Sequence, residues 1–330
     1  MATKRDIALL AGVSPATVSN FYNSRGKMSI DTQQRIIDAA NALNFPLPAS
    51  KEHSKITFLV VDDLLNPHYY NILQGMNSIA CKYNIPVSMI LLWDDVDAFC
   101  SMLIANQVHA VYFATFMHRI NESHISRLRS NGICVHFSWD NFTIDFDSLI
   151  NQAIRYLADL GHKRISYLSG LSINDTSNTR YHSYLKAMEE NHLPLDRELI
   201  IDGVFPYFTD AKSGYWALKT FLDKKIDFTA IIALNDLLAI GAMNALRESG
   251  LSIPQDVSVI GCDDIMVAEF MNPPLTTLRF SAKDIGIRTM YSIIQQEGKP
   301  ANNSPVILQT ELIIRKSTGK APKSENDEQS

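Results

Sequence analysis

The stretch AGVSPATVSN, within residues 4–45, constrains the fold of this chain more than any other part of the sequence. Gly12 permits a tight turn, because glycine adopts positive φ angles that other residues resist. Ser14 is a favourable N-cap and Pro15 suits the first helical position, so we predict that a helix begins there. Two helices joined across such a glycine turn form a helix-turn-helix.

Helices are predicted on both sides of this element. Asp6 is predicted to open the preceding helix, whose apolar stripe comprises Ile7, Leu10 and Ala11. Ser29 is predicted to cap a third helix, and its apolar stripe comprises Ile36, Ile37, Ala40 and Leu43. The three helices together would form a small all-α domain.

The middle helix carries the side chains that would contact DNA. Val13, Val18 and Phe21 are expected to pack on the other two helices. The opposite face then enters the major groove, where Asn20 would bond adenine and Ala16 would touch a thymine methyl group. The predicted DNA contacts are Ser14, Pro15, Ala16, Thr17, Ser19, Asn20, Asn23 and Lys27. The alternative is a helical cap without a nucleic-acid role.

The charge distribution favours DNA as the partner of this end of the chain. The net charge of the 330 residues is -5. Residues 1–55 nevertheless hold seven Lys and Arg against four acidic residues, a net charge of +3, whereas the remainder is -8. A basic head on an acidic body suits contact with phosphate through the head alone.

The rest of the chain is predicted to be an α/β body. Residues 46–55 (PLPASKEHSK) have no periodicity and read as a linker. From Ile56 to Cys262, short apolar runs alternate with helical patterns, which is typical of parallel sheets covered by helices on both faces. The length favours two similar lobes.

Polar side chains follow several of these predicted strands. His68 and Tyr69 follow the first strand, and Asn235 and Asp263 follow two later ones. Arg180 opens a helix after a polar loop. Ligands bind beyond the carboxyl ends of parallel strands, so these residues are candidates for binding a small polar molecule. The alternative is that Asn235 and Asp263 merely cap loops and helices.

Other classes of protein have weaker support. The four cysteines match no metal or CxxC spacing, so we predict no metal and no cofactor. No GxSxG, P-loop or Rossmann glycine pattern is present. The paired carboxylates 62–63 and 263–264 are adjacent residues, which point apart rather than flank one substrate bond. We therefore predict that the chain is not an enzyme. No apolar leader or membrane-length apolar run is visible, which predicts a cytoplasmic protein without a membrane partner.

Several segments resemble transcription regulators of the lactose-repressor/galactose-repressor (LacI/GalR) family, in the order found there. They are DIALLAGVSPATVSNFYN, MSIDTQQRIIDAANALNF, NPHYYNILQGM, YLADLGHKRISYLSG, ALNDLLAIGAMNALRESGLSIPQDVSVIGCDD and NPPLTTLRFSAKDIG. The resemblance implies a homodimer that binds a pseudo-palindromic double-stranded operator. It also implies a body like the periplasmic sugar-binding proteins, with parallel sheets in two lobes joined by three crossovers, and an effector between the lobes.

The resemblance also implies domain boundaries and effector contacts. Residues 1–45 would be the DNA-binding domain, 46–55 a linker with a shortened or absent hinge helix, 56–316 the effector-binding and dimerisation core, and 317–330 a polar disordered tail. The N-lobe would comprise about 56–143 and 279–304, and the C-lobe about 144–278 and 305–316. The implied effector contacts are His68, Tyr69, Arg180, Asn235, Asp263 and Phe280.

Three features depart from the family pattern. Pro15 and Ala16 stand where relatives usually carry base-contacting side chains, which leaves Asn20 as the main polar reader. The linker lacks the leucine that relatives insert into the minor groove. Ile144-Asp145-Phe146 replaces the usual Val-Asp-Asn, and Phe280 stands where the family often has a polar residue.

A repressor controlled by a small effector, a sugar or related polar metabolite, is therefore the function that the sequence favours. One alternative is a regulator with a weakened head that acts through a partner protein. The other is a solute-binding or sugar-processing protein on the same core. The tail lacks heptads, which favours a dimer over a tetramer.

Overall fold

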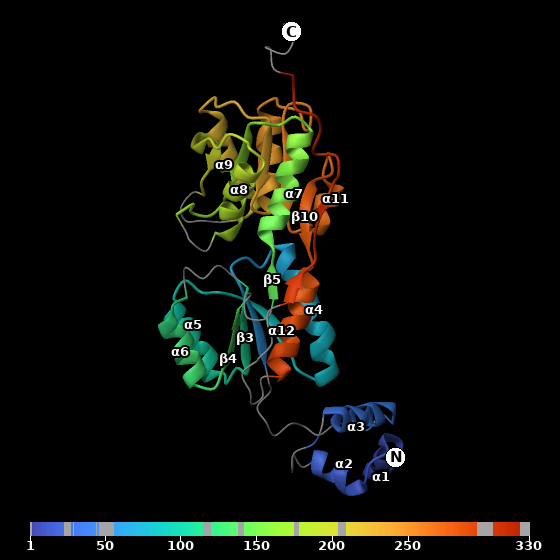
Figure 1. Cartoon of the computed structure of the whole chain (residues 1–330). Helices are drawn as coiled ribbons and strands as arrows, with labels where there is room; N and C mark the ends of the chain where they lie inside the picture. The colour runs from blue at the N-terminus through green and yellow to red at the C-terminus, as the bar shows by residue number, and fades with distance from the viewer. Residues whose placement is uncertain are drawn as a thin grey trace. The chain divides into compact units, whose positions relative to one another are not determined.

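A computed structural model of the chain describes residues 2–22, 28, 30–43, 45, 56–114, 120–137, 142–174, 178–203, 209–295 and 306–323. The chain divides into two compact units, Met1–Ser54 and Lys55–Ser330, which are called the head and the body below. The predicted linker 46–55, and with it the question of a hinge helix, lies outside the described residues. Figure 1 shows the course of the chain.

The head is the predicted helix-turn-helix with a third helix. Its elements are α1 (Lys4–Ala11), α2 (Pro15–Tyr22) and α3 (Ile30–Ala42). Val18 and Ile36 are fully buried in the head core, and Val13 and Phe21 pack against that core as predicted. Gly12 adopts a φ of 62° and ends α1 in the left-handed conformation that the turn requires.

Two details of α1 differ from the prediction. The helix does not open at Asp6: Thr3 is its N-cap, and Asp6 returns the hydrogen bond in a reciprocal capping box. Leu10 is not part of the buried stripe, since 57% of it is exposed, whereas Ala8 is buried. The buried face of α1 comprises Ile7, Ala8 and Ala11.

The N-lobe of the body is a four-stranded parallel sheet in the order β2-β1-β3-β4. Its strands are β1 (Thr57–Val61), β2 (Val87–Leu91), β3 (Ala110–Phe113) and β4 (Cys134–Phe137). Alternate residues face opposite sides: Leu59 packs in one core cluster and Val60 in the other. Both faces are therefore buried.

Helix pairs cover the two faces of the N-lobe sheet. The helices are α4 (Pro67–Ala80), the short η1 (Cys81–Tyr83), α5 (Val96–Ala105), α6 (Glu122–Ser130) and α12 (Ala282–Gln295). Helices α5 and α6 contribute Phe99 and Leu128 to the Val60 side of the sheet. Helix α4 contributes Ile72 and Met76 to the Leu59 side and packs against α12.

The C-lobe is a six-stranded sheet in the order β12-β10-β9-β8-β6-β7. Its strands are β6 (Ile165–Leu168), β7 (Ile200–Ile201), β8 (Ala230–Ala233), β9 (Ser258–Cys262), β10 (Thr276–Phe280) and β12 (Thr310–Ile313). All neighbours are parallel except β10 and β12, which are antiparallel. The predicted fold class is thus confirmed, with one antiparallel edge strand.

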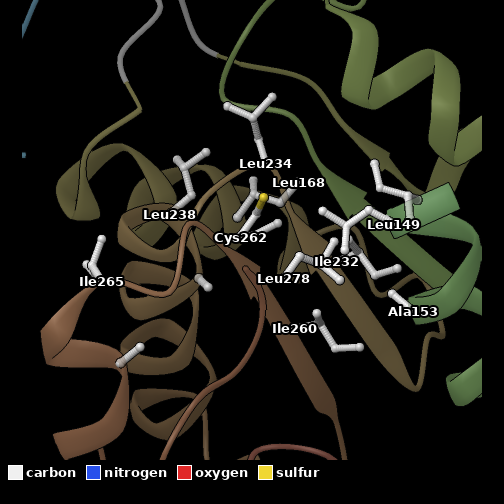
Figure 2. Packing of buried hydrophobic residues seen from close by; sticks show 14 of the residues in the cluster. Leu149, Ala153, Leu168, Ile232, Leu234, Leu238, Ile260, Cys262, Ile265 and Leu278 are labelled. Atoms are coloured by element: carbon white, nitrogen blue, oxygen red, sulfur yellow. The ribbon is translucent and has the colours of Figure 1, made fainter. Parts of the chain in front are cut away.

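Helices also cover the C-lobe sheet. They are α7 (Phe146–Asp159), α8 (Thr179–Glu190), the short η3 (Arg197–Leu199), α9 (Ala211–Leu222), α10 (Asp236–Glu248) and α11 (Met266–Phe270). Figure 2 shows the interior of this lobe, where Leu168, Ile232, Ile260, Leu278 and neighbouring apolar side chains pack together.

Helix pairs in both lobes approach so closely that glycines are required. A Cβ on Gly75 of α4 would lie 2.0 Å from the carbonyl oxygen of Lys283, and a Cβ on Gly286 of α12 would lie 2.0 Å from that of Ile72. Gly214 of α9 and Gly241 of α10 meet in the same way in the C-lobe. These crossings bring backbone directly against backbone.

Three crossovers connect the lobes. The first runs through β5 (Phe142–Ile144) into α7, the second leaves β10 for α12, and the third returns through β11 (Val306–Leu308) into β12. Strands β5 and β11 pair in parallel, so two of the crossovers form one ribbon. Figure 1 shows β5 at the connection between the lobes.

The prediction that a disordered tail starts at residue 317 is wrong for its first residues. Ser317 is fully buried, and its hydroxyl group donates to the carbonyl oxygen of Val259 at 2.6 Å. The N–H of Gly319 donates to Ser258 Oγ at 3.0 Å, and that of Ala321 to the carbonyl oxygen of Leu160 at 2.9 Å. The segment docks because the Ser317 hydroxyl group and the backbone N–H groups of Gly319 and Ala321 satisfy acceptors of the C-lobe.

Candidate functional site

The first candidate site is the exposed face of α2 in the head. Pro15, Ala16 and Asn20 are exposed, and Ser19 is half-buried, so the face predicted to enter the major groove is accessible. The opposite side carries Val18, which is fully buried. The helix therefore presents one amide and two small apolar surfaces to solvent.

The N-terminus of α2 is fixed by its own hydroxyl groups. Ser14 Oγ accepts from the backbone N–H of Thr17 at 3.0 Å, which confirms Ser14 as the N-cap, and it lies 2.7 Å from Thr17 Oγ1. Both residues were predicted to contact DNA, and both hydroxyl groups already have a partner within the turn. Asn23 and Lys27 lie outside the described residues.

Arg35 of α3 holds the turn between α1 and α2. Its Nη2 donates to the carbonyl oxygens of Ala11 at 2.6 Å and Gly12 at 2.8 Å, and its Nε donates to Ala11 at 3.0 Å. A guanidinium group satisfies several carbonyls at once because its donors form a rigid fork. Arg35 counts among the basic residues of the head, yet its role in this structure is to orient α2.

The second candidate site lies where α4 of the N-lobe meets the C-lobe, and Arg180 is at its centre. Its Nη1 donates to the carbonyl oxygen of Leu234 at 2.5 Å, and its Nη2 to Asp263 Oδ1 at 3.4 Å. The guanidinium carbon lies 4.7 Å from the ring centroid of Phe146 and 5.7 Å from that of Phe280. Arg180 thus joins a cation–π cluster to a carboxylate.

His68 brings the N-lobe to this cluster. Its Nδ1 lies 4.0 Å from Asp263 Oδ1 and has no hydrogen-bond partner among the described residues. Burial lowers the pKa of the His68 imidazole below its usual value, although Asp263 opposes the shift. This shift favours the neutral imidazole, whose Nδ1 is buried without a hydrogen-bond partner among the described residues.

Tyr69 and Asn235 are more fully engaged within the protein. Tyr69 donates its hydroxyl group to Asp62 Oδ1 at 2.7 Å, and burial, reinforced by Asp62, raises its pKa well above the usual value. Asn235 Oδ1 accepts from the N–H of Leu238 at 2.8 Å, and its Nδ2 donates to the carbonyl oxygen of Thr209 at 2.9 Å. Asn235 therefore caps α10, in line with the alternative considered for it.

Phe280 and Phe146 close the cluster from two different crossovers. Phe280 packs edge-on against both His68, at 5.6 Å between ring centroids, and Phe146, at 5.8 Å. The sequence singled out Phe280, whereas Phe146 appeared only as a departure from the family pattern. That departure was the signal, because both unusual aromatic residues contact Arg180.

Within the described ranges, no three His, Cys, Asp or Glu side chains are grouped so that they could hold a metal ion. In the same part of the chain, no helix is both long and apolar enough to cross a membrane.

A helix-turn-helix head on a two-lobed binding-protein body defines a ligand-responsive DNA-binding regulator. Residues 3–46 match the sequence model of bacterial regulatory proteins of the lacI family, and residues 154–318, half of the chain, match that of the periplasmic binding protein-like domain. The chain belongs to the LacI/GalR family of transcriptional regulators, and it is not an enzyme.

Relatives of known role are similar over almost the whole chain. The transcriptional repressor PurR of Mannheimia succiniciproducens is 28% identical over 97% of this chain and 99% of its own length. The repressor CytR of Escherichia coli K12 is 28% identical over 97% of both chains. This chain is accordingly a DNA-binding transcriptional repressor.

Solved structures share the fold. The lac repressor dimer bound to operator and the anti-inducer ONPF has a TM-score of 0.68 at 23% identity, covering 96% of this chain and 99% of that one. The regulator CelR in complex with cellobiose has a TM-score of 0.69 at 23% identity, covering 96% and 100%.

Proposed function

We propose that this repressor binds its operator through the exposed face of α2 and its effector through the cluster around Arg180. The observation that carries the proposal is that Asp263 Oδ1 of the C-lobe lies 4.0 Å from His68 Nδ1 of the N-lobe and 3.4 Å from Arg180 Nη2 of the C-lobe. A ligand that bonds to both lobes changes the balance between their arrangements, because it favours the arrangement with which it makes more contacts.

The proposed effector is a sugar or related polar metabolite with an apolar face. His68 and Asp263 offer hydrogen bonds, and Phe146 and Phe280 offer apolar ring surface beside them. Ribose, sucrose and cellobiose occur in structures of proteins with this fold, which makes sugars a sensible first choice. Tyr69 and Asn235 are proposed to line the site and to keep their internal hydrogen bonds.

On the DNA side, Asn20 is proposed as the main polar base contact, with Pro15 and Ala16 contributing apolar contacts. Ser14, Thr17, Ser19, Asn23 and Lys27 are proposed to contact the DNA backbone. We further propose that the protein acts as a cytoplasmic homodimer on a pseudo-palindromic operator. The proposed domain limits are 1–45 for the head, 46–55 for the linker and 56 onward for the core.

Effector binding is tested by a thermal-shift screen of sugars and nucleobases on the full chain. A ligand that binds only the folded state raises the melting temperature with its concentration. We expect the stabilising compound to lose its effect in Arg180→Lys, which keeps the charge but loses the planar fork. The matched control is Arg164→Lys, on the C-lobe surface. Stabilisation that survives Arg180→Lys would remove Arg180 from the site.

DNA recognition is tested by selecting sequences from a random library and measuring affinity by fluorescence anisotropy. Asn20→Ala should weaken binding to the selected sequence by roughly 5- to 150-fold, the equivalent of a lost bidentate base contact. Asn244→Ala makes the same change at an exposed helical position of the body. If Asn20→Ala keeps the parent chain's ratio of affinities for selected and random DNA, Asn20 does not contact a base.

A further inference from the structure

Asp236 is a completely buried carboxyl group at the first position of α10. Its Oδ2 accepts from the backbone N–H of Ile265 at 2.8 Å. Its Oδ1 accepts from the hydroxyl group of Thr277 at 2.5 Å. One side chain thereby connects α10 to the loop after β9 and to β10, although it was not among the predicted effector contacts.

Strand β9 is built to leave room for this carboxyl group. A Cβ on Gly261 would lie 2.1 Å from Asp236 Oδ1 and 3.2 Å from the Asp236 Cα. These distances are shorter than normal contacts, so residue 261 must be glycine while the carboxyl group stays in place. The carboxyl group is therefore enclosed by β9, the following loop and β10.

The loop that Asp236 supports has a strained backbone. Asp263 has a φ of 115° and Asp264 a φ of 48°, in the region that favours glycine. Non-glycine residues persist there only where surrounding contacts hold them. The N–H of Asp263 donates to the carbonyl oxygen of Leu278 at 2.8 Å, and that of Asp264 points to Thr277 Oγ1 at 3.4 Å. Thr277 is the same residue that donates to Asp236.

The neighbouring charges are distributed unevenly around these three carboxyl groups. Asp263 faces Arg180 at 3.4 Å, and Asp264 faces Arg315 at 2.7 Å and Arg279 at 3.3 Å. Asp236 has a hydroxyl group and a backbone N–H as its hydrogen-bond donors.

Burial, and then the negative charges of Asp263 and Asp264, raise the pKa of Asp236 to about 7. The buried thiol of Cys262 also lies beside Asp236, and burial raises the pKa of this thiol above the usual range. Asp236 therefore exchanges its proton close to neutral pH.

We propose that Asp236 is a positioning residue whose protonation state sets where the loop 263–265 holds Asp263 in front of Arg180 and His68. When ionised, the carboxylate accepts from both donors and repels Asp263. When protonated, it donates its proton to Thr277 Oγ1, whose own hydrogen turns away, and the repulsion ends. Effector affinity is thereby linked to pH. The proposal rests on the proposed function only in treating Asp263 as an effector contact.

The test follows backbone amide chemical shifts of the full, isotope-labelled chain from about pH 5 to about pH 9. We expect the amides of Ile265 and Asp263 to shift together with a midpoint of about 7. Both steps should vanish in Asp236→Asn, because its amide oxygen accepts from Ile265, its NH₂ group donates to Thr277, and it does not titrate. Asp227→Asn, at an exposed carboxylate, should leave them intact.

A second variant keeps the carboxyl group. Thr277→Val removes the hydroxyl donor that favours the ionised form, so the midpoint at Ile265 should move to higher pH. The proposal is overturned if the Ile265 amide shows no pH-dependent change in chemical shift, or if Ile265 shows one and Asp263 does not. It is also overturned if the change at Asp263 survives Asp236→Asn, because that change then belongs to another group such as His68. Neither DNA nor effector is present, so this result is independent of the ligand screen.

Discussion

Replacing Gly286 by alanine should force α4 and α12 apart. The added Cβ would lie 2.0 Å from the carbonyl oxygen of Ile72, whereas ordinary contacts of this kind begin at 3.4 Å. The helices must therefore separate by about 1.4 Å at this point. The obstacle is backbone, so it cannot rotate out of the way as the end of a flexible side chain would.

The energetic cost follows from two opposing effects. Overpacking of this kind costs about 1–3 kcal/mol. Alanine in a helix interior gains about 0.5–1 kcal/mol over glycine. Because the clash is with backbone, we expect a net loss of about 2 kcal/mol, or roughly 4–8 °C in melting temperature for a body of this size.

Urea denaturation monitored by circular dichroism measures this loss. Lys283→Ala is the control, since it changes an exposed side chain of the same helix and should cost less than about 0.5 kcal/mol. Gly75→Ala meets the same crossing, because its Cβ would lie 3.1 Å from the Gly286 Cα. The double variant should therefore cost less than the sum of the two. Stability equal to that of the parent chain would refute the close crossing.

Further predictions concern the head, the buried carboxyl group and the docked tail. Because the folded pKa of Asp236 is raised from 3.8 to about 7, the free energy of unfolding of the parent chain should fall by up to ~4 kcal/mol as pH rises through that interval. Asp236→Asn lacks this titrating group and should not show that loss. Denaturation at several pH values measures both chains, and the same pH dependence of stability in both would contradict the prediction. Thr3→Ala removes the capping box of α1 and should cost the head about 1 kcal/mol, measured by amide hydrogen exchange of α1, with Ser126→Ala in α6 as the control. Ending the chain after Lys316 removes partners of Val259 and Ser258 and should cost about 2–4 kcal/mol, whereas ending it after Lys323 should have no effect on the melting temperature.

The parts of the fold with strong local signals were predictable. The glycine turn and the Ser14-Pro15 pair fix the start of α2, and the alternation of apolar runs with helical patterns fixes the parallel sheets. The carboxyl ends of parallel strands share one edge of a sheet, so Asn235, which follows β8, and Asp263, which follows β9, could be placed near a common site from sequence order alone.

Other features depend on contacts that a local reading cannot contain. Ser317 lies in a segment whose composition resembles a solvated tail, and it docks because distant backbone groups of β9 need partners. Leu10 fits the spacing of a buried stripe, but the face of α1 that is buried in the head core carries Ile7, Ala8 and Ala11, and Leu10 lies outside it. Asp236 follows Asn235 in sequence and looks like an ordinary helix-opening acid; its importance arises from Gly261 and Thr277, which only the folded sheet brings to it.

The pairing of β5 with β11 limits how the lobes move relative to each other. Hydrogen bonds join Phe142–Ile144 to Val306–Leu308 in register, so sliding one crossover along the other would break every bond of the ribbon at once. Bending or twisting of the ribbon keeps those bonds. Phe146 and Phe280 add an aromatic contact between the first and second crossovers. The β5–β11 ribbon therefore allows the lobes to bend and twist relative to each other but resists a sliding motion between them.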